Sequence, residues 1–304
     1  MNWRFKAALH QALTVLPFGD RIHYWAQRHV IKSLPASERA FTETVTVAKR
    51  HLEEWNRYGN RDAADATFYE FGAGRDLIVP FYLYCMGMER QTVVDVQALA
   101  KVELVNETIR KFRTLELRRI PSKFLPQGPR RKALSLLEEW YGIRYVAPAD
   151  PRNTGLDGCS MDFISSTNTL EHIPPSEIPL TLQECFRLLK DDGLMGLRID
   201  YQDHYSYSDP GISAYNFLQY SPFIWKLYSP SMHFQNRLRH RDYLDLITRS
   251  GFVVLRESLQ KGAVEDLQVL RHLLLDDSFQ RRYTLEEMAI RTSYVVARKG
   301  KPIG

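Results

Sequence analysis

A carboxylate, Glu70, stands near the end of an apolar run and is followed closely by two glycines, Gly72 and Gly74. A turn with almost no side chains lets a ligand lie directly against the backbone. A phosphate-bearing dinucleotide would need a third glycine three residues after the second, and Leu77 occupies that position. Glu70 would also repel a pyrophosphate. The spacing therefore disfavours a nicotinamide cofactor and favours a ligand with positive charge and no phosphate.

S-adenosylmethionine (SAM) meets both conditions, because it carries an ammonium and a sulfonium and has no phosphate. Carboxylates and aromatic faces stabilise such cations. At this point the sequence resembles class I SAM-dependent methyltransferases, whose first motif is an acid followed by glycines at alternate positions. Residues 156–175, which contain Leu-Glu-His-Ile, resemble the fourth-strand segment of that family, and residues 188–200 resemble the helix, turn and fifth strand after it. The resemblance covers about residues 66–201, and two terminal strands extend it to the end.

The resemblance implies a Rossmann-like fold and SAM as the cofactor. Asp95 would accept hydrogen bonds from both ribose hydroxyls, a geometry that suits a carboxylate, and Asp150 would accept one from the adenine amino group. The alternatives are a helix N-cap for Asp95 and a turn before Pro151 for Asp150. The family's frequent third glycine falls on Asp76, which makes the loop less permissive. The residues expected to bind the cofactor are Glu70, Gly72, Ala73, Gly74, Asp95, Asp150 and Asn168.

The acceptor is expected to enter beyond the fourth and fifth strands, where His172 and His204 follow apolar runs. A hydroxyl acceptor has to lose its proton, and histidine is the side chain whose ordinary pKa suits this near neutral pH. His204 is the leading candidate for the base, and His172 is the second. The alternatives are a structural His172, a His204 that pins its loop, and a loop whose aromatic side chains only pack over the sheet. The residues expected to contact the acceptor are Asp200, Tyr201, His233 and Arg237.

The N-terminal segment 16–35, taken with the rest of the chain, is similar to uncharacterised methyltransferases of bacterial polysaccharide gene clusters. This likeness implies O-methylation of a small-molecule, glycan or lipid-linked sugar acceptor. The alternative is a SAM-binding fold that has lost the transfer activity and serves as a regulator or partner of another protein.

The elements that must position these residues alternate between strand and helix. Such alternation predicts an α/β fold, a seven-stranded and mostly parallel sheet with helices on both faces. A helix is expected over residues 176–193, closed by Gly193. Residues 1–66 are interpreted as an N-terminal helical extension, 67–304 as the methyltransferase domain, and 201–236 as an aromatic-rich insertion that covers the substrate. The expected strands are 65–71, 91–97, 143–150, 161–168, 194–200, 252–258 and 292–300.

Positive charge is concentrated in residues 108–132, which hold nine Lys and Arg against one Glu, a net +8 in a chain of net +5. A solvated surface, an anionic substrate and peripheral contact with an anionic membrane surface are the alternatives. No nucleic-acid partner is expected, because the stretch lacks interleaved glycines and stacking aromatics.

The composition favours a cytoplasmic enzyme, with the membrane contact at the inner face. The apolar run 77–88 is shorter than the roughly 20 residues of a membrane span, and residues 1–20 lack the uninterrupted apolar segment of a signal peptide. Cys85, Cys159 and Cys185 show no metal-ligand spacing and are expected to be buried thiols in a reducing compartment, so no metal is expected.

Overall fold

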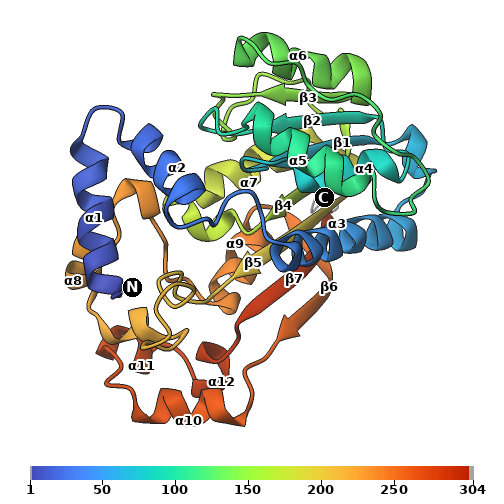
Figure 1. The fold of residues 1–304 in the computed structure, drawn as a ribbon. Helices are drawn as coiled ribbons and strands as arrows, with labels where there is room; N and C mark the ends of the chain where they lie inside the picture. Colours follow the sequence, from blue (N-terminus) through green and yellow to red (C-terminus); the bar gives the residue numbers. More distant parts are fainter. Residues whose placement is uncertain (1, 301–304) are drawn as a thin grey trace.

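A seven-stranded β-sheet forms the centre of the protein in the computed structural model, which describes residues 2–300 (Figure 1). Its strands are β1 (Thr67–Phe71), β2 (Arg90–Val94), β3 (Ile143–Val146), β4 (Met161–Thr167), β5 (Leu189–Asp200), β6 (Phe252–Gln260) and β7 (Thr292–Lys299). They lie in the order β3-β2-β1-β4-β5-β7-β6. Neighbouring strands from β3 to β5 are parallel, and β7 is antiparallel to both β5 and β6. The predicted α/β class and the mostly parallel sheet are confirmed.

Helices cover both faces of the sheet, because successive strand side chains point to opposite faces. Phe68 and Phe163 pack in one core with α3 to α6, whereas Tyr69 and Ile164 pack in a second core with α7 and α9. Each fully buried side chain of this size contributes about 1.5–3 kcal/mol. The helices are α1 (Trp3–Val15), α2 (Gly19–His29), α3 (Glu38–Tyr58), α4 (Ile78–Cys85), α5 (Val102–Phe112), α6 (Arg130–Tyr141), α7 (Ile178–Leu188), α8 (Pro222–Tyr228), α9 (His240–Arg249), α10 (Val264–His272), α11 (Asp277–Gln280) and α12 (Leu285–Met288). Among the described residues, no helix combines the length and the apolarity that crossing a membrane requires.

The expected helix over residues 176–193 is wrong at its end, since α7 stops at Leu188 and Leu189 already has extended backbone. Leu188 and Leu189 are both fully buried, and Leu189 pairs with Met161 of β4 before the strand bulges. Gly193 therefore does not close a helix. A Cβ added to Gly193 would lie 2.8 Å from the Leu189 side chain, so this glycine permits the close approach of the bulge to the core.

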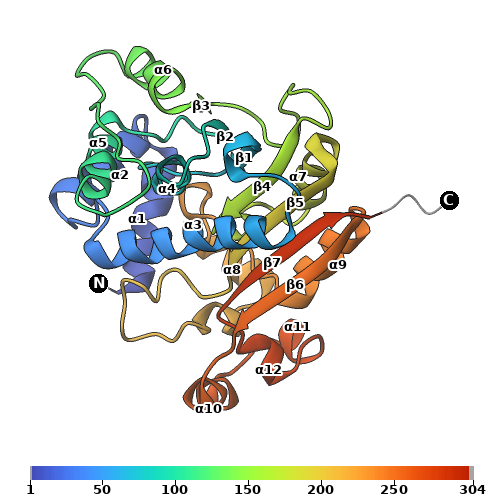
Figure 2. The ribbon, with the colours of Figure 1, turned by 90° about the vertical axis from the view of Figure 1, so that its right-hand side faces the viewer.

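A third core lies beyond the carboxyl end of β5 and joins segments that are far apart in the sequence. Trp3 of α1 packs against Tyr205 and Tyr228 of the 201–236 insertion, with ring centroids 5.6 and 4.8 Å apart. The same core takes in α10, α11 and α12, which the sequence analysis did not anticipate between β6 and β7. Figure 2 shows these three helices together at the end of the β6–β7 pair. The N-terminal helices thus separate, because α3 covers the sheet while α1 packs on the insertion.

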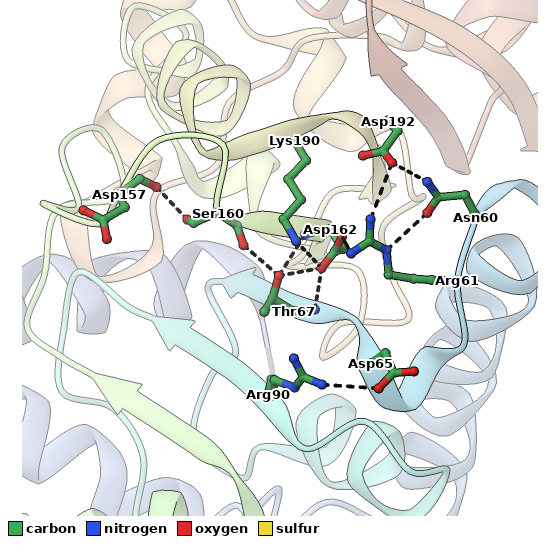
Figure 3. Close-up of polar contacts among 10 residues, drawn as sticks. All are labelled: Asn60, Arg61, Asp65, Thr67, Arg90, Asp157, Ser160, Asp162, Lys190 and Asp192. Atoms are coloured by element: carbon green, nitrogen blue, oxygen red, sulfur yellow. Dashed lines mark hydrogen bonds and ion pairs between the residues drawn. The ribbon is translucent and has the colours of Figure 1, made fainter.

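The amino ends of β1, β4 and β5 are held together by a buried carboxylate, Asp162 (Figure 3). Its Oδ2 accepts hydrogen bonds from the Thr67 backbone N–H at 2.8 Å and from Lys190 Nζ at 2.9 Å, and its Oδ1 lies 3.2 Å from Arg61. These bonds outweigh the effect of burial and lower the pKa of Asp162. This network fixes the end of the sheet opposite the candidate site.

Candidate functional site

A cavity of about 740 Å³ opens at the carboxyl ends of β1, β2, β3 and β4. The strand order reverses between β1 and β4, and ligands of open α/β sheets bind outside such a switch point. Four segments form most of the wall, one after each strand: residues 71–74, 94–99, 148–152 and 168–174. Ser231, Met232 and Phe234 of the insertion close one side. The sequence analysis passed over these three residues because they carry no chemistry of their own.

The turn after β1 presents bare backbone to this cavity. Gly72 and Gly74 have φ of +77° and +76°, a backbone conformation that residues other than glycine rarely adopt. A Cβ added to Gly72 would lie 2.3 Å from the side chain of Thr169. A Cβ added to Gly74 would meet nothing within 4 Å, so open space lies beside that backbone. Leu77, at the position of the missing third glycine, is fully buried and immediately precedes α4, with a φ of +56°.

Asp95, directly after β2, places a carboxylate on the cavity wall, and one of its two oxygens is available to a ligand. The side chain is buried, and Oδ1 accepts a hydrogen bond from the Gln97 backbone N–H at 3.2 Å. Among the described residues Oδ2 has no hydrogen-bond partner. Burial raises the pKa of Asp95 above its usual value. An orphaned buried acceptor on a cavity wall is suited to a ligand hydroxyl.

Glu70 lies behind the glycine turn, where it is 1% exposed. Neither of its carboxylate oxygens has a hydrogen-bond partner among residues 2–300. Burial raises its pKa to about 8, and the neighbouring carboxyl groups of Asp95 and Asp76 add to the rise. Three carboxyl groups thus gather around the turn, a charge pattern that favours a cation and disfavours a phosphate.

Asp150 and Asn168 also line the cavity. Asp150 is partly exposed and makes a two-pronged ion pair with Arg152, with N–O distances of 2.9 and 2.8 Å, which lowers the pKa of its carboxyl group. The Arg152 backbone N–H donates to Asp150 Oδ1 at 2.9 Å, so the turn that was the alternative interpretation is present. Arg152 also pairs with Glu177 at 3.0 Å. The structure therefore adds Arg152 and Glu177 to this wall.

Of the two candidate bases, His172 lines the cavity and His204 lies behind it. His172 Nδ1 is 2.8 Å from the carbonyl oxygen of Phe234, so Nδ1 carries the proton and Nε2 keeps its lone pair. Burial among its neighbours, with a smaller contribution from His204, lowers the pKa of His172 to about 4. The His204 ring centroid is 4.9 Å from that of His172, and its Nε2 is 3.6 Å from Asp200 Oδ2.

The four residues expected to contact the acceptor pack against other parts of the protein and lie outside the cavity lining. Asp200 accepts hydrogen bonds from the Tyr207 hydroxyl and the Gln202 backbone. The Tyr201 hydroxyl is buried against His240 and Ser293. His233 packs between His10 and Tyr205, and Arg237 donates to the carbonyl oxygens of Phe217 and Tyr220. None of Asp200, Tyr201, His233 and Arg237 lines the cavity.

Comparison with known proteins gives no match to a protein-family model and none to a curated protein. Solved structures share parts of the fold. The [4+2]-cyclase SpnF is 13% identical over 88% of this chain and 83% of its own, with a TM-score of 0.49. A 1,6-didemethyltoxoflavin-N1-methyltransferase from Burkholderia thailandensis is 15% identical over 99% and 92%, with a TM-score of 0.48. A geranyl diphosphate C-methyltransferase from Streptomyces coelicolor A3(2) is 12% identical over 88% and 86%, with a TM-score of 0.47. At these identities the likeness concerns the fold, and function has to be argued from the site.

Proposed function

We propose that this protein is a SAM-dependent methyltransferase that methylates a hydroxyl group of a small-molecule, glycan or lipid-linked sugar acceptor. The observation that carries the proposal is the cavity wall at Asp95. A buried carboxylate oxygen without a partner there shares a cavity with the bare turn from Gly72 to Gly74. This combination suits a ligand with a ribose diol and a cationic amino-acid end.

The residues present fit such a ligand. Asp95 Oδ2 would accept from the ribose hydroxyls, and the backbone of residues 72–74 would hold the methionine end. Glu70 would ionise in response to a bound cation and so supply negative charge behind the turn, and Asp150 with Asn168 would border the adenine. When bound, SAM supplies a methyl group on a positively charged sulfur. The chain has to orient the acceptor oxygen toward that methyl group, exclude water and take up the hydroxyl proton.

The pair of His172 and His204 is proposed to handle that proton. His172 offers Nε2 at the cavity wall, because its Nδ1 is engaged with the Phe234 carbonyl oxygen. With a pKa lowered to about 4, His172 is neutral at pH 7 but only weakly basic. A proton that reaches it would therefore have to pass on, and His204 with Asp200 behind it forms the next set of acceptors.

Thermal melts with SAM, S-adenosylhomocysteine and NAD⁺ test the proposal. A ligand present at 100 times its Kd stabilises the folded state by about 2.7 kcal/mol. We expect SAM and S-adenosylhomocysteine to raise the melting temperature and NAD⁺ to leave it unchanged. A rise with NAD⁺ and none with SAM would contradict the proposal.

A non-catalytic SAM-binding protein is the second candidate. The observation that favours it is that Tyr201, His233 and Arg237 do not line the cavity, and that Tyr201 and Arg237 make their hydrogen bonds inside the protein. Incubation with methyl-labelled SAM and a panel of hydroxylated sugars, lipids and small molecules separates the two. Label transfer to any acceptor favours the enzyme, whereas tight SAM binding without transfer across the panel favours the regulator.

We also propose that α1, α2 and α8 form a surface that rests on an anionic membrane. α1 contacts both α2 and α8, and the three lie along one side of the molecule (Figure 1). Large apolar side chains are exposed on and beside them. Residues 1–40 hold six Lys and Arg against two Asp and Glu, a net +4. Apolar side chains within a basic surface are typical of proteins that lie in a membrane interface. These apolar residues include Phe5, Phe18, Trp25, Phe223 and Leu227, each more than half exposed.

Flotation with phosphatidylglycerol-containing vesicles tests this surface. We expect binding that rises with the anionic lipid fraction, falls with salt and is lost in a Phe18→Ser, Phe223→Ser double variant. Leu274→Ser is the matched control, because Leu274 is 86% exposed outside this surface. Flotation that does not depend on lipid charge, or equal loss in the control, would refute the membrane contact.

A further inference from the structure

Glu171, His172 and His204 meet beyond the carboxyl ends of β4 and β5, next to the cavity. Glu171 and His172 lie in a 3-10 turn, Leu170–His172, that follows β4, and His204 follows β5 by four residues. One carboxylate oxygen and one ring nitrogen from each histidine all lie within 4.8 Å of one another. The sheet thus brings His204 next to Glu171 and His172, from which it is more than 30 residues away in the sequence.

These groups have unused bonding capacity. Glu171 is 1% exposed, and neither of its carboxylate oxygens has a hydrogen-bond partner within the described part of the chain. His204 Nε2 is buried and likewise has no hydrogen-bond partner there. Burial of a carboxylate is costly unless a counter-charge or hydrogen-bond donors satisfy it. Orphaned acceptors on two of three converging side chains indicate that a bound group is missing from the protein's own contacts.

Neighbouring residues contact His172 and His204 in the way that hydrogen-bond partners hold the ligands of a metal ion in place. The Phe234 carbonyl oxygen accepts the Nδ1 proton of His172, which fixes the ring and directs the Nε2 lone pair away from that contact. Asp200 Oδ2 lies 3.6 Å from His204 Nε2 and adds a second negative charge. Arg198 also acts on Glu171, so one positive charge stands against the carboxyl groups of Glu171 and Asp200. The net charge of the cluster favours a divalent cation.

We propose that Glu171, His172 and His204 hold a divalent transition-metal ion that binds the acceptor hydroxyl. Two imidazoles and one carboxylate suit Zn²⁺, Fe²⁺ or Co²⁺ rather than Mg²⁺ or Ca²⁺, which prefer oxygen ligands. Ligands bound at about 2.1 Å lie roughly 3–3.5 Å apart, so side-chain movements of about 1 Å complete the site. Because His172 lines the cavity, the open coordination positions face the space where the acceptor would sit.

The role at the acceptor rests on the proposed function and replaces the proton route through His172 and His204, because the ring lone pairs that would accept the proton bind the metal instead. A bound cation lowers the pKa of a coordinated hydroxyl, so the proton leaves to solvent water without a strong base. The acceptor oxygen then forms its bond to the methyl carbon, while the carbon–sulfur bond breaks and the electron pair stays on sulfur. No oxidant or reductant takes part. In this arrangement His172 does not have to accept the proton, so its weak basicity does not slow the reaction.

Metal titration of the full chain tests the site directly. Protein stripped with a chelator is titrated with Co²⁺, followed by calorimetry and by the visible absorption of bound Co²⁺, with Zn²⁺ as the competitor. We expect one equivalent to bind, and Glu171→Gln and His204→Gln each to weaken binding at least about 100-fold. His272→Gln, at an exposed helix end, is the control and should bind as the wild type does. No saturable Co²⁺ binding by the wild type, or unchanged binding in both variants, overturns the proposal.

Two further measurements separate this proposal from the proposed function. Calorimetry with SAM on the stripped protein shows whether the donor binds. If the protein binds Co²⁺ but not SAM, the metal site is supported and the methyltransferase proposal is contradicted. If SAM binds and label transfer continues at full rate in the stripped protein, the role at the acceptor is overturned. SAM affinity within a few-fold of wild type shows that a variant is folded, and His204→Gln carries the test if Glu171→Gln does not fold.

Discussion

At the scale of single residues, the site contains buried carboxyl groups, Glu70 and Asp95, whose pKa values burial raises above their ordinary values. Glu70 has a pKa of about 8 in the folded protein against an ordinary value of 4.5. Between these values the folded state retains a proton that the unfolded state has lost. The free energy of unfolding of the ligand-free protein therefore falls as pH rises from about 4.5 to 8, by at most about 1.4 kcal/mol per pH unit from this group.

Glu70→Gln should remove this pH dependence, because the amide cannot ionise. Urea denaturation at pH 5 and pH 8 is the measurement, and we expect the variant to gain stability over the wild type at pH 8 and little at pH 5. The variant should also bind SAM more weakly, because it lacks a charge that complements the donor. Equal pH dependence in variant and wild type would show that Glu70 does not hold a raised pKa.

Asp162 illustrates the opposite use of a buried carboxylate, because the protein supplies it with hydrogen bonds from Thr67 and ion pairs with Lys190 and Arg61. Asp162→Ala should lower the free energy of unfolding by about 3–5 kcal/mol, because Lys190 and the Thr67 backbone lose their buried partner. Asp192→Ala is the control, since that side chain is half exposed at the rim of the same network (Figure 3) and should cost less than about 1 kcal/mol. Similar losses in both variants would contradict this account.

At the scale of elements, the sequence predicted the strands well and the segments between them less well. The strands are runs of alternating or continuous apolar residues, and burial against helices on both faces leaves little freedom in their register. Gly193 misled the prediction because its role is a close approach to Leu189 and not a helix end. Of the helices between β6 and β7, α11 and α12 were missed because they have four residues each, too few to show helical periodicity.

The docking of α1 on the insertion depends on histidines that stay neutral. His10 and His233 have ring centroids 4.7 Å apart, and burial lowers their pKa values to about 4 and about 2. Lys6 and His23 face His10 and oppose its protonation. Below pH 6.5 these histidines are protonated in the unfolded state but stay neutral in the folded state, so the free energy of unfolding decreases as pH falls.

His233→Asn should therefore flatten the fall in melting temperature between pH 7.5 and pH 5, because the amide carries no titrating group. His272→Asn, at an exposed position, serves as the control and should leave the pH profile unchanged. Melting temperatures for the three proteins are compared at each pH. If His233→Asn keeps the full wild-type slope, the acid sensitivity of this contact has another source.

At the scale of the whole molecule, the residues expected to bind the donor and those expected to contact the acceptor differ in whether they line the cavity. Gly72, Gly74, Asp95, Asp150 and Asn168 all line one cavity, because each follows the carboxyl end of a parallel strand. The residues expected to contact the acceptor were chosen by chemical type and by their position after the strands, and none of them lines the cavity. Arg237, for example, is held between the rings of Trp225 and Phe279. A polar side chain in an irregular segment carries no sequence signal that separates a site residue from a packing residue.

The central claim is that the cavity beside Asp95 binds SAM through its ribose hydroxyls, and calorimetry on one variant tests it most directly. Hydrogen bonds to a charged group are worth about 1.5–3 kcal/mol each, so Asp95→Ala should weaken SAM binding at least about tenfold in a protein that remains folded. Asp65→Ala, the same change at the opposite end of the sheet, should bind SAM like the wild type. Wild-type SAM affinity in folded Asp95→Ala, or no SAM binding by the wild-type chain, would contradict the account.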